Sequence, residues 1–158
     1  DVDSAEKRAR EQLAINPDNA LTNYQAHRAF IWSGRFDEAR PALEAVRTSS
    51  IRPANKQLAE IRQACAEGRL DDAKNFRKKL DQDADISTRW QAAKLLGDDA
   101  GARALLAPLD NAEGLPELIQ FLFQPTFEPR DFPALMARLE IEGVEPRPAV
   151  ETPSRCRA

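Results

Sequence analysis

The 158-residue sequence has few of the residues on which enzymes and metal sites depend, since it contains one histidine and two cysteines. Zinc sites need clustered Cys and His ligands, and His27, Cys65 and Cys156 are too widely separated to form such a motif. His27 falls at a helix-crossing face, so we expect a packed, hydrogen-bonded histidine and not a catalytic base. Cys65 has no accompanying base motif that would activate a nucleophile. The sequence therefore predicts a protein that is not an enzyme and that uses no metal or other cofactor.

Two cysteines are also too few for a disulfide framework. Cys65 falls within an expected helix and Cys156 within the C-terminal tail, so we expect two unpaired thiols and a cytoplasmic location. The alternative is a tail that folds back and forms a Cys65–Cys156 disulfide in an oxidising compartment such as the periplasm.

The chain lacks an excess of basic residues and lacks long apolar segments. Its formal net charge is -3 and its isoelectric point is about 5.3, so no overall positive field attracts nucleic acid. No window approaches the roughly 18 apolar residues of a membrane span. Gly34, Gly68 and Gly97 are isolated from other glycines, which excludes a phosphate-binding glycine loop. The hydrophobic content of 42% and the charged content of 31% fit a soluble helical protein.

One short stretch of the sequence occurs twice. Residues 33–39 (Ser-Gly-Arg-Phe-Asp-Glu-Ala) return 34 positions later as residues 67–73 (Glu-Gly-Arg-Leu-Asp-Asp-Ala). In both copies a bulky apolar residue follows the glycine by two positions, and an alanine follows by five. Gly97 precedes Ala102 by the same five positions, and helical apolar spacing flanks each glycine. A period of 34 with a glycine turn between two helices predicts repeated helical hairpins.

These turns divide the chain into repeats, a cap and a tail. The expected segments are a partial repeat at 1–19, a complete unit at 20–53 closed by Pro53, a unit at 54–84, a degenerate unit at 85–112, capping helices at 113–144 and an extended tail at 145–158. Because the partial repeat has no first helix, we expect this chain to be the C-terminal part of a longer protein.

The two expected capping helices have different signatures. An unusually apolar run covers residues 115–123 and is ended by Pro125. Asp131 is the expected N-cap of the second helix, with Pro133 in its first turn. A stack of repeats needs its last apolar face covered, and we assign that role to these helices.

The repeated turn resembles that of the tetratricopeptide repeat family over about residues 3–110. Its specific part is Gly-x-aromatic-x-x-Ala at 34–39, and 68–73 has leucine in place of the aromatic residue. The resemblance implies an all-α, right-handed solenoid of helix hairpins that binds a peptide or partner domain on its concave face. The early tryptophan of the family is absent, and His27 replaces the small residue at the helix crossing, so the exact helix register stays open.

A second, shorter resemblance concerns residues 127–136 (Phe-Glu-Pro-Arg-Asp-Phe-Pro-Ala-Leu-Met). This segment is similar to the end of bacterial proteins that carry tetratricopeptide repeats behind a winged-helix regulator or a nucleotide cyclase. It implies an alternative function, namely a sensory or regulatory C-terminal domain of a larger transcriptional regulator or cyclase.

The first helices of successive repeats would line the concave face, so equivalent positions can be counted back from each glycine. Positions ten, six and three before a glycine lie on one helical face, and they supply the predicted partner-binding residues: Tyr24, Arg28, Leu58, Arg62, Gln91 and Lys94. The arginines would donate hydrogen bonds to a carboxylate or phosphate, and Tyr24 and Leu58 would supply apolar contact. The competing interpretation is that these arginines are ordinary solvated or internally paired side chains.

We therefore expect a non-catalytic protein–protein interaction module. Its partner would be a protein or a peptide, with no nucleic acid and no membrane span in this chain, and its oligomeric state is open. A different arrangement would place the tail, with Arg155, Cys156 and Arg157, in the groove of its own chain, which would make the protein self-capped.

Overall fold

The computed structural model describes residues 2–80 and 84–156, and these residues form helices and loops without a β-strand. The α-helices are α1 (Val2–Ile15), α2 (Ala20–Trp32), α3 (Phe36–Thr48), α4 (Pro53–Ala66), α5 (Leu70–Leu80), α6 (Ile86–Leu95), α7 (Asp99–Leu106), α8 (Leu115–Leu118) and α9 (Pro133–Ile141). The expected all-α class is confirmed. Residues 81–83 of the expected unit at 54–84, and the tail residues 157–158, lie outside the described part. No described helix has the length and apolar character needed to span a membrane.

Three helical hairpins, α2–α3, α4–α5 and α6–α7, bend at glycines. Gly34, Gly68 and Gly97 have φ angles of 72°, 73° and 77°. After the first of them, the N–H of Arg35 donates to the carbonyl of Phe30 at 2.8 Å, and the same bond recurs at the other two bends. This is the Schellman closure of a helix C-terminus, which places glycine in the left-handed region. The 34-residue repeat of glycine therefore has a conformational cause.

Pro53 starts a helix instead of ending a repeat. It is the first residue of α4, where its fixed φ suits the helix and its missing N–H removes no intrahelical bond. The expected boundary between the second and third units therefore moves one residue towards the N-terminus.

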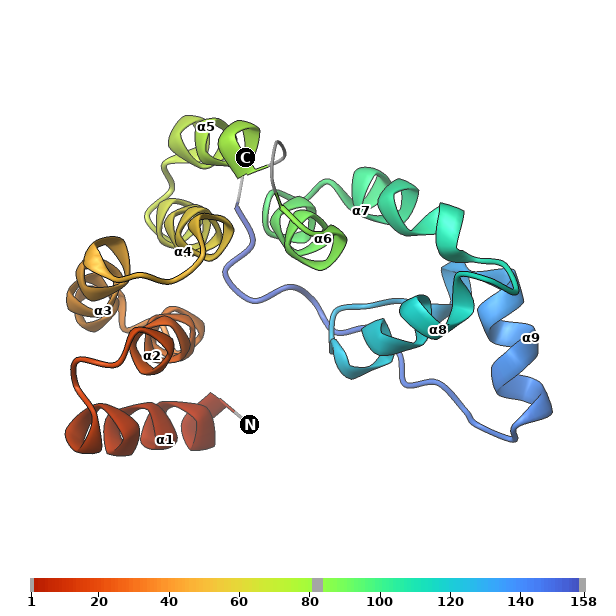
Figure 1. Cartoon of the computed structure of the whole chain (residues 1–158), viewed down its shortest axis with the longest axis horizontal. Helices are drawn as coiled ribbons and strands as arrows, with labels where there is room; N and C mark the ends of the chain where they lie inside the picture. The colour runs from red at the N-terminus through yellow and green to blue at the C-terminus, as the bar shows by residue number, and fades with distance from the viewer. Residues whose placement is uncertain (1, 81–83, 157–158) are drawn as a thin grey trace.

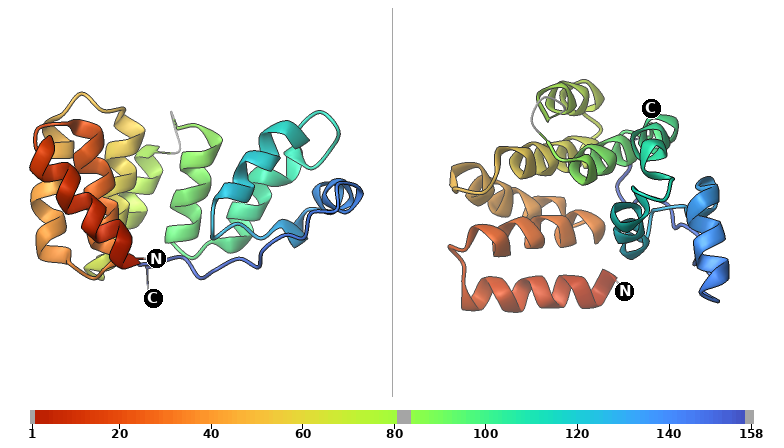
Figure 2. Two further views of the ribbon diagram at one scale, coloured as in Figure 1. Left: turned by 90° about the horizontal axis from the view of Figure 1, so that it is seen from below. Right: turned by 45° about the vertical axis from the view of Figure 1, so that its right-hand side comes forward.

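The first helices of the hairpins, α2, α4 and α6, pack side by side, and α3, α5 and α7 lie on their outer side (Figure 1). In the same view α1 to α7 follow an arc, with α1 packed against α2. Two further views show these helices running alongside one another (Figure 2). The inner helices therefore present one shared face towards the inside of the arc.

The core has an alanine-rich part and an aromatic part. Small residues at the helix crossings, such as Ala26, Ala39, Ala64 and Ala73, are fully buried and let the hairpin helices approach closely. The aromatic part joins α6 and α7 to the C-terminal segments and contains Trp90, Phe121, Phe127 and Phe132 together with Leu106, Leu118, Leu135 and Leu139. This second part covers the last hairpin.

The first C-terminal helix is much shorter than the apolar run predicted. α8 ends at Leu118, and Ile119–Phe123 continues as a 3₁₀ helix. A 3₁₀ helix has three residues per turn, so Leu118 and Phe121 lie on one side and are both buried. The tighter winding therefore aims Phe121 at Trp90, with the ring centroids 5.4 Å apart.

The cap of α9 comes from a distant residue. Asp131 ends the 3₁₀ helix Pro129–Asp131, and Phe132 at the start of α9 makes no side-chain cap. The carboxylate of Asp110 accepts the N–H groups of Ala134 and Leu135 at 3.2 and 2.9 Å. The expected N-cap role of Asp131 is therefore wrong, because a loop residue at the end of the repeats fills it.

The tail lacks helical structure over residues 145–156 and runs back inside the arc towards α4 and α6 (Figure 1). The N–H of Val150 donates to the carbonyl of Pro125 at 2.8 Å. Further along, the hydroxyl of Ser154 donates to the carbonyl of Ile31 at 3.1 Å. The extended tail thus lies against the inner helices.

Candidate binding site

Four of the six predicted partner-binding residues line one cavity of about 270 Å³: Arg28, Arg62, Gln91 and Lys94. They come from α2, α4 and α6, where they occupy positions six or three residues before a glycine bend. The side-chain oxygen of Gln91 accepts a hydrogen bond from Nη2 of Arg62 at 3.1 Å. The repeat register therefore brings together residues that lie far apart in the sequence.

Arg62 is a buried cation with an unused hydrogen-bond donor. Only 3% of the residue is exposed, and its guanidinium lies 5.2 Å from the centre of the Tyr24 ring. Its Nη2 atom donates to Gln91, whereas its Nη1 atom has no hydrogen-bond partner. A buried charge is costly unless it is paired and hydrogen-bonded. Arg62 therefore favours an anion in the cavity.

Arg28 is the second cation of the site. Its guanidinium lies 4.9 Å from the centre of the Trp32 ring. Burial, and then the positive charge of Arg62, lower the pKa of Arg28. Within residues 2–80 and 84–156, no carboxylate forms an ion pair with Arg28 or Arg62. The two guanidiniums therefore repel each other, and no carboxylate in the described part of the chain compensates their charge.

Lys94, in contrast, is already neutralised. Its Nζ atom lies 2.6 Å from a carboxylate oxygen of Asp99, which also forms an ion pair with Arg155 at 2.9 Å. The hydrogen bond from Lys94 lowers the pKa of Asp99 against the opposing effect of burial. Lys94 therefore forms part of the cavity wall, and the uncompensated charge is that of the arginines.

Tyr24 and Leu58 lie in the core and not on a binding surface. Leu58 is 1% exposed and Tyr24 is 8% exposed. Positions ten residues before a glycine face the packing between helices, so the predicted apolar contact of these two residues with a partner is wrong. Tyr24 reaches the site only through its ring, which supports the guanidinium of Arg62.

The remaining cavity walls were not predicted as a site. Trp32 and Trp90 line the cavity together with residues 124–126 and the tail residues Val150, Thr152 and Pro153. From the sequence, the tail was placed near the inner helices only in two alternatives, the Cys65–Cys156 disulfide and the tail in the groove of its own chain. The indole rings add apolar surface beside the two cations.

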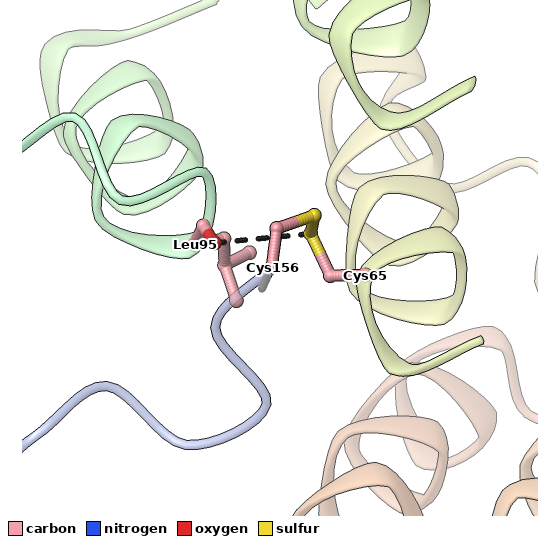
Figure 3. The surroundings of a disulfide bond; sticks show 3 residues. All are labelled: Cys65, Leu95 and Cys156. Carbon is pink, nitrogen blue, oxygen red and sulfur yellow. Dashed lines mark hydrogen bonds between the residues drawn. A yellow bond between two sulfur atoms is a disulfide. The ribbon is translucent and has the colours of Figure 1, made fainter. Parts of the chain in front are cut away.

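Cys65 and Cys156 form a disulfide that joins α4 to the tail (Figure 3). Leu95 at the end of α6 lies beside the bond, and its carbonyl accepts the N–H of Cys156 at 2.8 Å. The expectation of two unpaired thiols is therefore wrong. Helical periodicity gives no information on this pairing, because the path of the chain through the cap decides whether the tail returns to α4.

His27 has the packing role that the sequence predicted. It is fully buried, and its Nε2 atom lies 3.1 Å from Oε1 of Gln63. Burial and the charge of Arg62 lower the pKa of His27 to about 4, so the ring is neutral at pH 7. Across the described residues, no group of three His, Cys, Asp or Glu side chains is arranged to hold a metal ion.

The site can bind an anion. Guanidinium groups present parallel N–H donors that match a carboxylate or a phosphate, and the cavity contains two such groups that no carboxylate of the described residues pairs with. The indole of Trp32 beside Arg28 would contact an apolar part of the same ligand.

No protein-family model, curated protein or solved structure matches this chain. The tetratricopeptide relationship therefore depends on the repeated glycine turn, and we treat it as part of the proposal below.

Proposed function

We propose that this chain is a non-catalytic protein–protein interaction module of the tetratricopeptide type, a right-handed solenoid that binds a partner on its concave side. The observation that carries the proposal is the uncompensated positive charge of Arg28 and Arg62 on adjacent inner helices. A carboxylate or phosphate of the partner would supply the missing counter-charge, and electrostatic complementarity of this kind selects partners.

An open groove supports a peptide or a protein segment as the ligand. It has a volume of about 450 Å³ and lies between α1 and α2, where it is lined by residues that include Arg8, Gln12 and Gln25. Arg28 and Trp32 line both this groove and the cavity. A bound segment can therefore lie along the groove while one acidic group reaches the arginine pair.

The disulfide supports an oxidising compartment, such as the periplasm, over the cytoplasm. Reducing systems keep cytosolic thiols reduced, whereas disulfides persist in secreted and periplasmic proteins. The cytoplasmic location expected from unpaired thiols loses its basis, since the cysteines are paired.

A second candidate function is a sensory or regulatory domain of a larger bacterial regulator or cyclase. The supporting observation is that the cavity lies between the repeats and the C-terminal segments, so that a small effector would contact both. Residues 127–136, which resemble the ends of such proteins, contribute Phe127, Phe132 and Leu135 to the aromatic core. The gene sequence upstream of Asp1 distinguishes the two candidates, because a DNA-binding or cyclase domain there would favour regulation.

The test of the leading proposal is a selection from a random peptide library on the full chain. We expect the selected peptides to be enriched in Asp and Glu, and we expect Arg28→Glu to abolish this enrichment. Arg52→Glu is the matched control, because Arg52 is exposed and does not line the cavity. Selected peptides without acidic residues, or an enrichment that Arg28→Glu leaves unchanged, would contradict the proposal.

A further inference from the structure

The tail is attached to the inner helices by one covalent bond and few other contacts. The noncovalent contacts include the hydrogen bond of Ser154 to α2, the bond of the Cys156 N–H to α6, and the contacts of Arg155 with Gly97 and Asp99. Cys156 is the only buried residue of the described tail, residues 145–156. Since the tail buries little apolar surface, the disulfide is its principal attachment.

The attached tail lies directly beside the arginine pair. Ser154 bonds to the carbonyl of Ile31, one residue before Trp32 of the cavity wall, and Cys156 is joined to Cys65, one helical turn beyond Arg62. Val150 and other tail residues form a wall of the cavity. The tail therefore covers part of the strip along which α2, α4 and α6 present their equivalent positions.

We propose that the Cys65–Cys156 disulfide is a redox-controlled latch on the binding site. In the oxidised protein the tail restricts access to Arg28 and Arg62 from the side of α4 and α6. Reduction releases residues 145–156 and opens the strip from α2 to α6 to an acidic partner segment. This inference depends on the proposed function, because it assigns a regulation to the same site.

The reductant would be a dithiol, either a protein dithiol or dithiothreitol. One thiolate of the dithiol attacks the sulfur of Cys156, the Cys65–Cys156 bond breaks, and Cys65 leaves as a thiolate that takes up a proton. The second thiol of the reductant then attacks the mixed disulfide and releases Cys156 as a thiol. Two electrons pass to the protein, and the dithiol becomes a disulfide.

The structure offers an approach to Cys156. A hollow of about 460 Å³ is lined by residues 151–156 of the tail, so a reductant meets the disulfide from the tail side. Both cysteines pack in one apolar cluster, but Cys65 does not line this hollow. Attack at Cys156 is therefore the favoured direction.

The closing experiment uses the full chain in its oxidised form and after treatment with dithiothreitol. Hydrogen exchange reports the protection of the Cys156 amide, and fluorescence anisotropy reports the affinity for a labelled octaglutamate peptide, with octalysine as the control peptide. We expect reduction to remove the amide protection and to strengthen octaglutamate binding about tenfold or more. Cys156→Ser should bind like the reduced protein and should not respond to dithiothreitol.

The possible results distinguish a failure of the latch proposal from a failure of the proposed function. Persistent protection of the tail after reduction, or a released tail with unchanged octaglutamate affinity, would overturn the latch and leave the proposed function standing. If octaglutamate binds in neither state, the proposed function fails and the latch fails with it. Helical circular dichroism of each sample verifies that the chain is folded, and the reduced wild-type protein supplies the test if Cys156→Ser does not fold.

Discussion

The imidazole of His27 and the side-chain amide of Gln63 face each other where α2 crosses α4, with Nε2 of His27 3.1 Å from Oε1 of Gln63. The amide nitrogen of Gln63 donates to Glu67 at 2.8 Å, so Oε1 is left to accept from the histidine. His27 therefore carries its proton on Nε2, while its Nδ1 atom has no hydrogen-bond partner. The ring is held neutral in the folded protein.

This arrangement predicts a loss of stability in mild acid. The pKa of His27 is about 4 in the folded chain and about 6.5 in the unfolded chain, so the unfolded state binds more protons between these values. Stability falls as the pH drops through this window, by about 2 kcal/mol between pH 7 and pH 5. Denaturant unfolding at pH 7 and at pH 5 measures this difference in the free energy of unfolding. His27→Asn should show a smaller difference, and an equal difference would show that another group is responsible.

A second prediction concerns the hairpin bend at Gly34. An added Cβ would meet no atom within 4 Å, but the φ of 72° lies in the left-handed region. Gly34→Ala should therefore destabilise the chain by about 1 kcal/mol for conformational reasons alone. Asn tolerates this region better, so Gly34→Asn should have a smaller effect in thermal unfolding. Equal effects of Ala and Asn would contradict this explanation.

A further prediction is that alanine at the Gly97 bend destabilises the chain more than alanine at the Gly34 bend. A Cβ there would lie 2.8 Å from Nε of Arg155 in addition to the unfavourable φ. Gly97→Ala should therefore lower stability more than Gly34→Ala does, and Arg155→Ala should remove the excess in a double-mutant cycle. Equal unfolding free energies for the two glycine variants would show that the contact between Arg155 and residue 97 has no effect on stability.

The distant cap of α9 gives another prediction. Asp110→Ala removes the acceptor of the Ala134 and Leu135 N–H groups and should destabilise the chain by about 1 kcal/mol. Hydrogen exchange should show that the amides in the first turn of α9 lose protection. Asp131→Ala is the matched control, because the carboxylate of Asp131 forms an exposed ion pair with Arg103. A larger effect of the control variant would restore Asp131 as the cap.

The repeats could be predicted from the sequence because each hairpin bend depends on the local geometry of a few residues. A glycine with positive φ closes each first helix, and the 34-residue interval places Arg28 and Arg62 at the same turn of neighbouring helices. The same counting failed for Leu58, one turn earlier on α4, which is buried and does not line the cavity. That position faces the next helix and not the cavity, and the periodicity of one helix does not reveal where its neighbour lies.

The cap and the tail could not be predicted in the same way. Asp110 caps α9 from the end of the repeats, and Cys65 pairs with Cys156 across 91 positions. Both contacts depend on the path of the chain through the 3₁₀ segments, whose winding is decided by the packing of Phe121 and its aromatic neighbours. No local sequence pattern encodes that path.

The most direct test of the account is the equilibrium affinity of the reduced chain for octaglutamate, compared between wild type and Arg28→Glu. We predict that Arg28→Glu weakens octaglutamate binding about tenfold or more, whereas the exposed control Arg52→Glu leaves it nearly unchanged. The reversed charge should also make octalysine a better ligand for Arg28→Glu than for wild type. If Arg28→Glu binds octaglutamate as tightly as wild type does, the arginine pair is not the site of recognition.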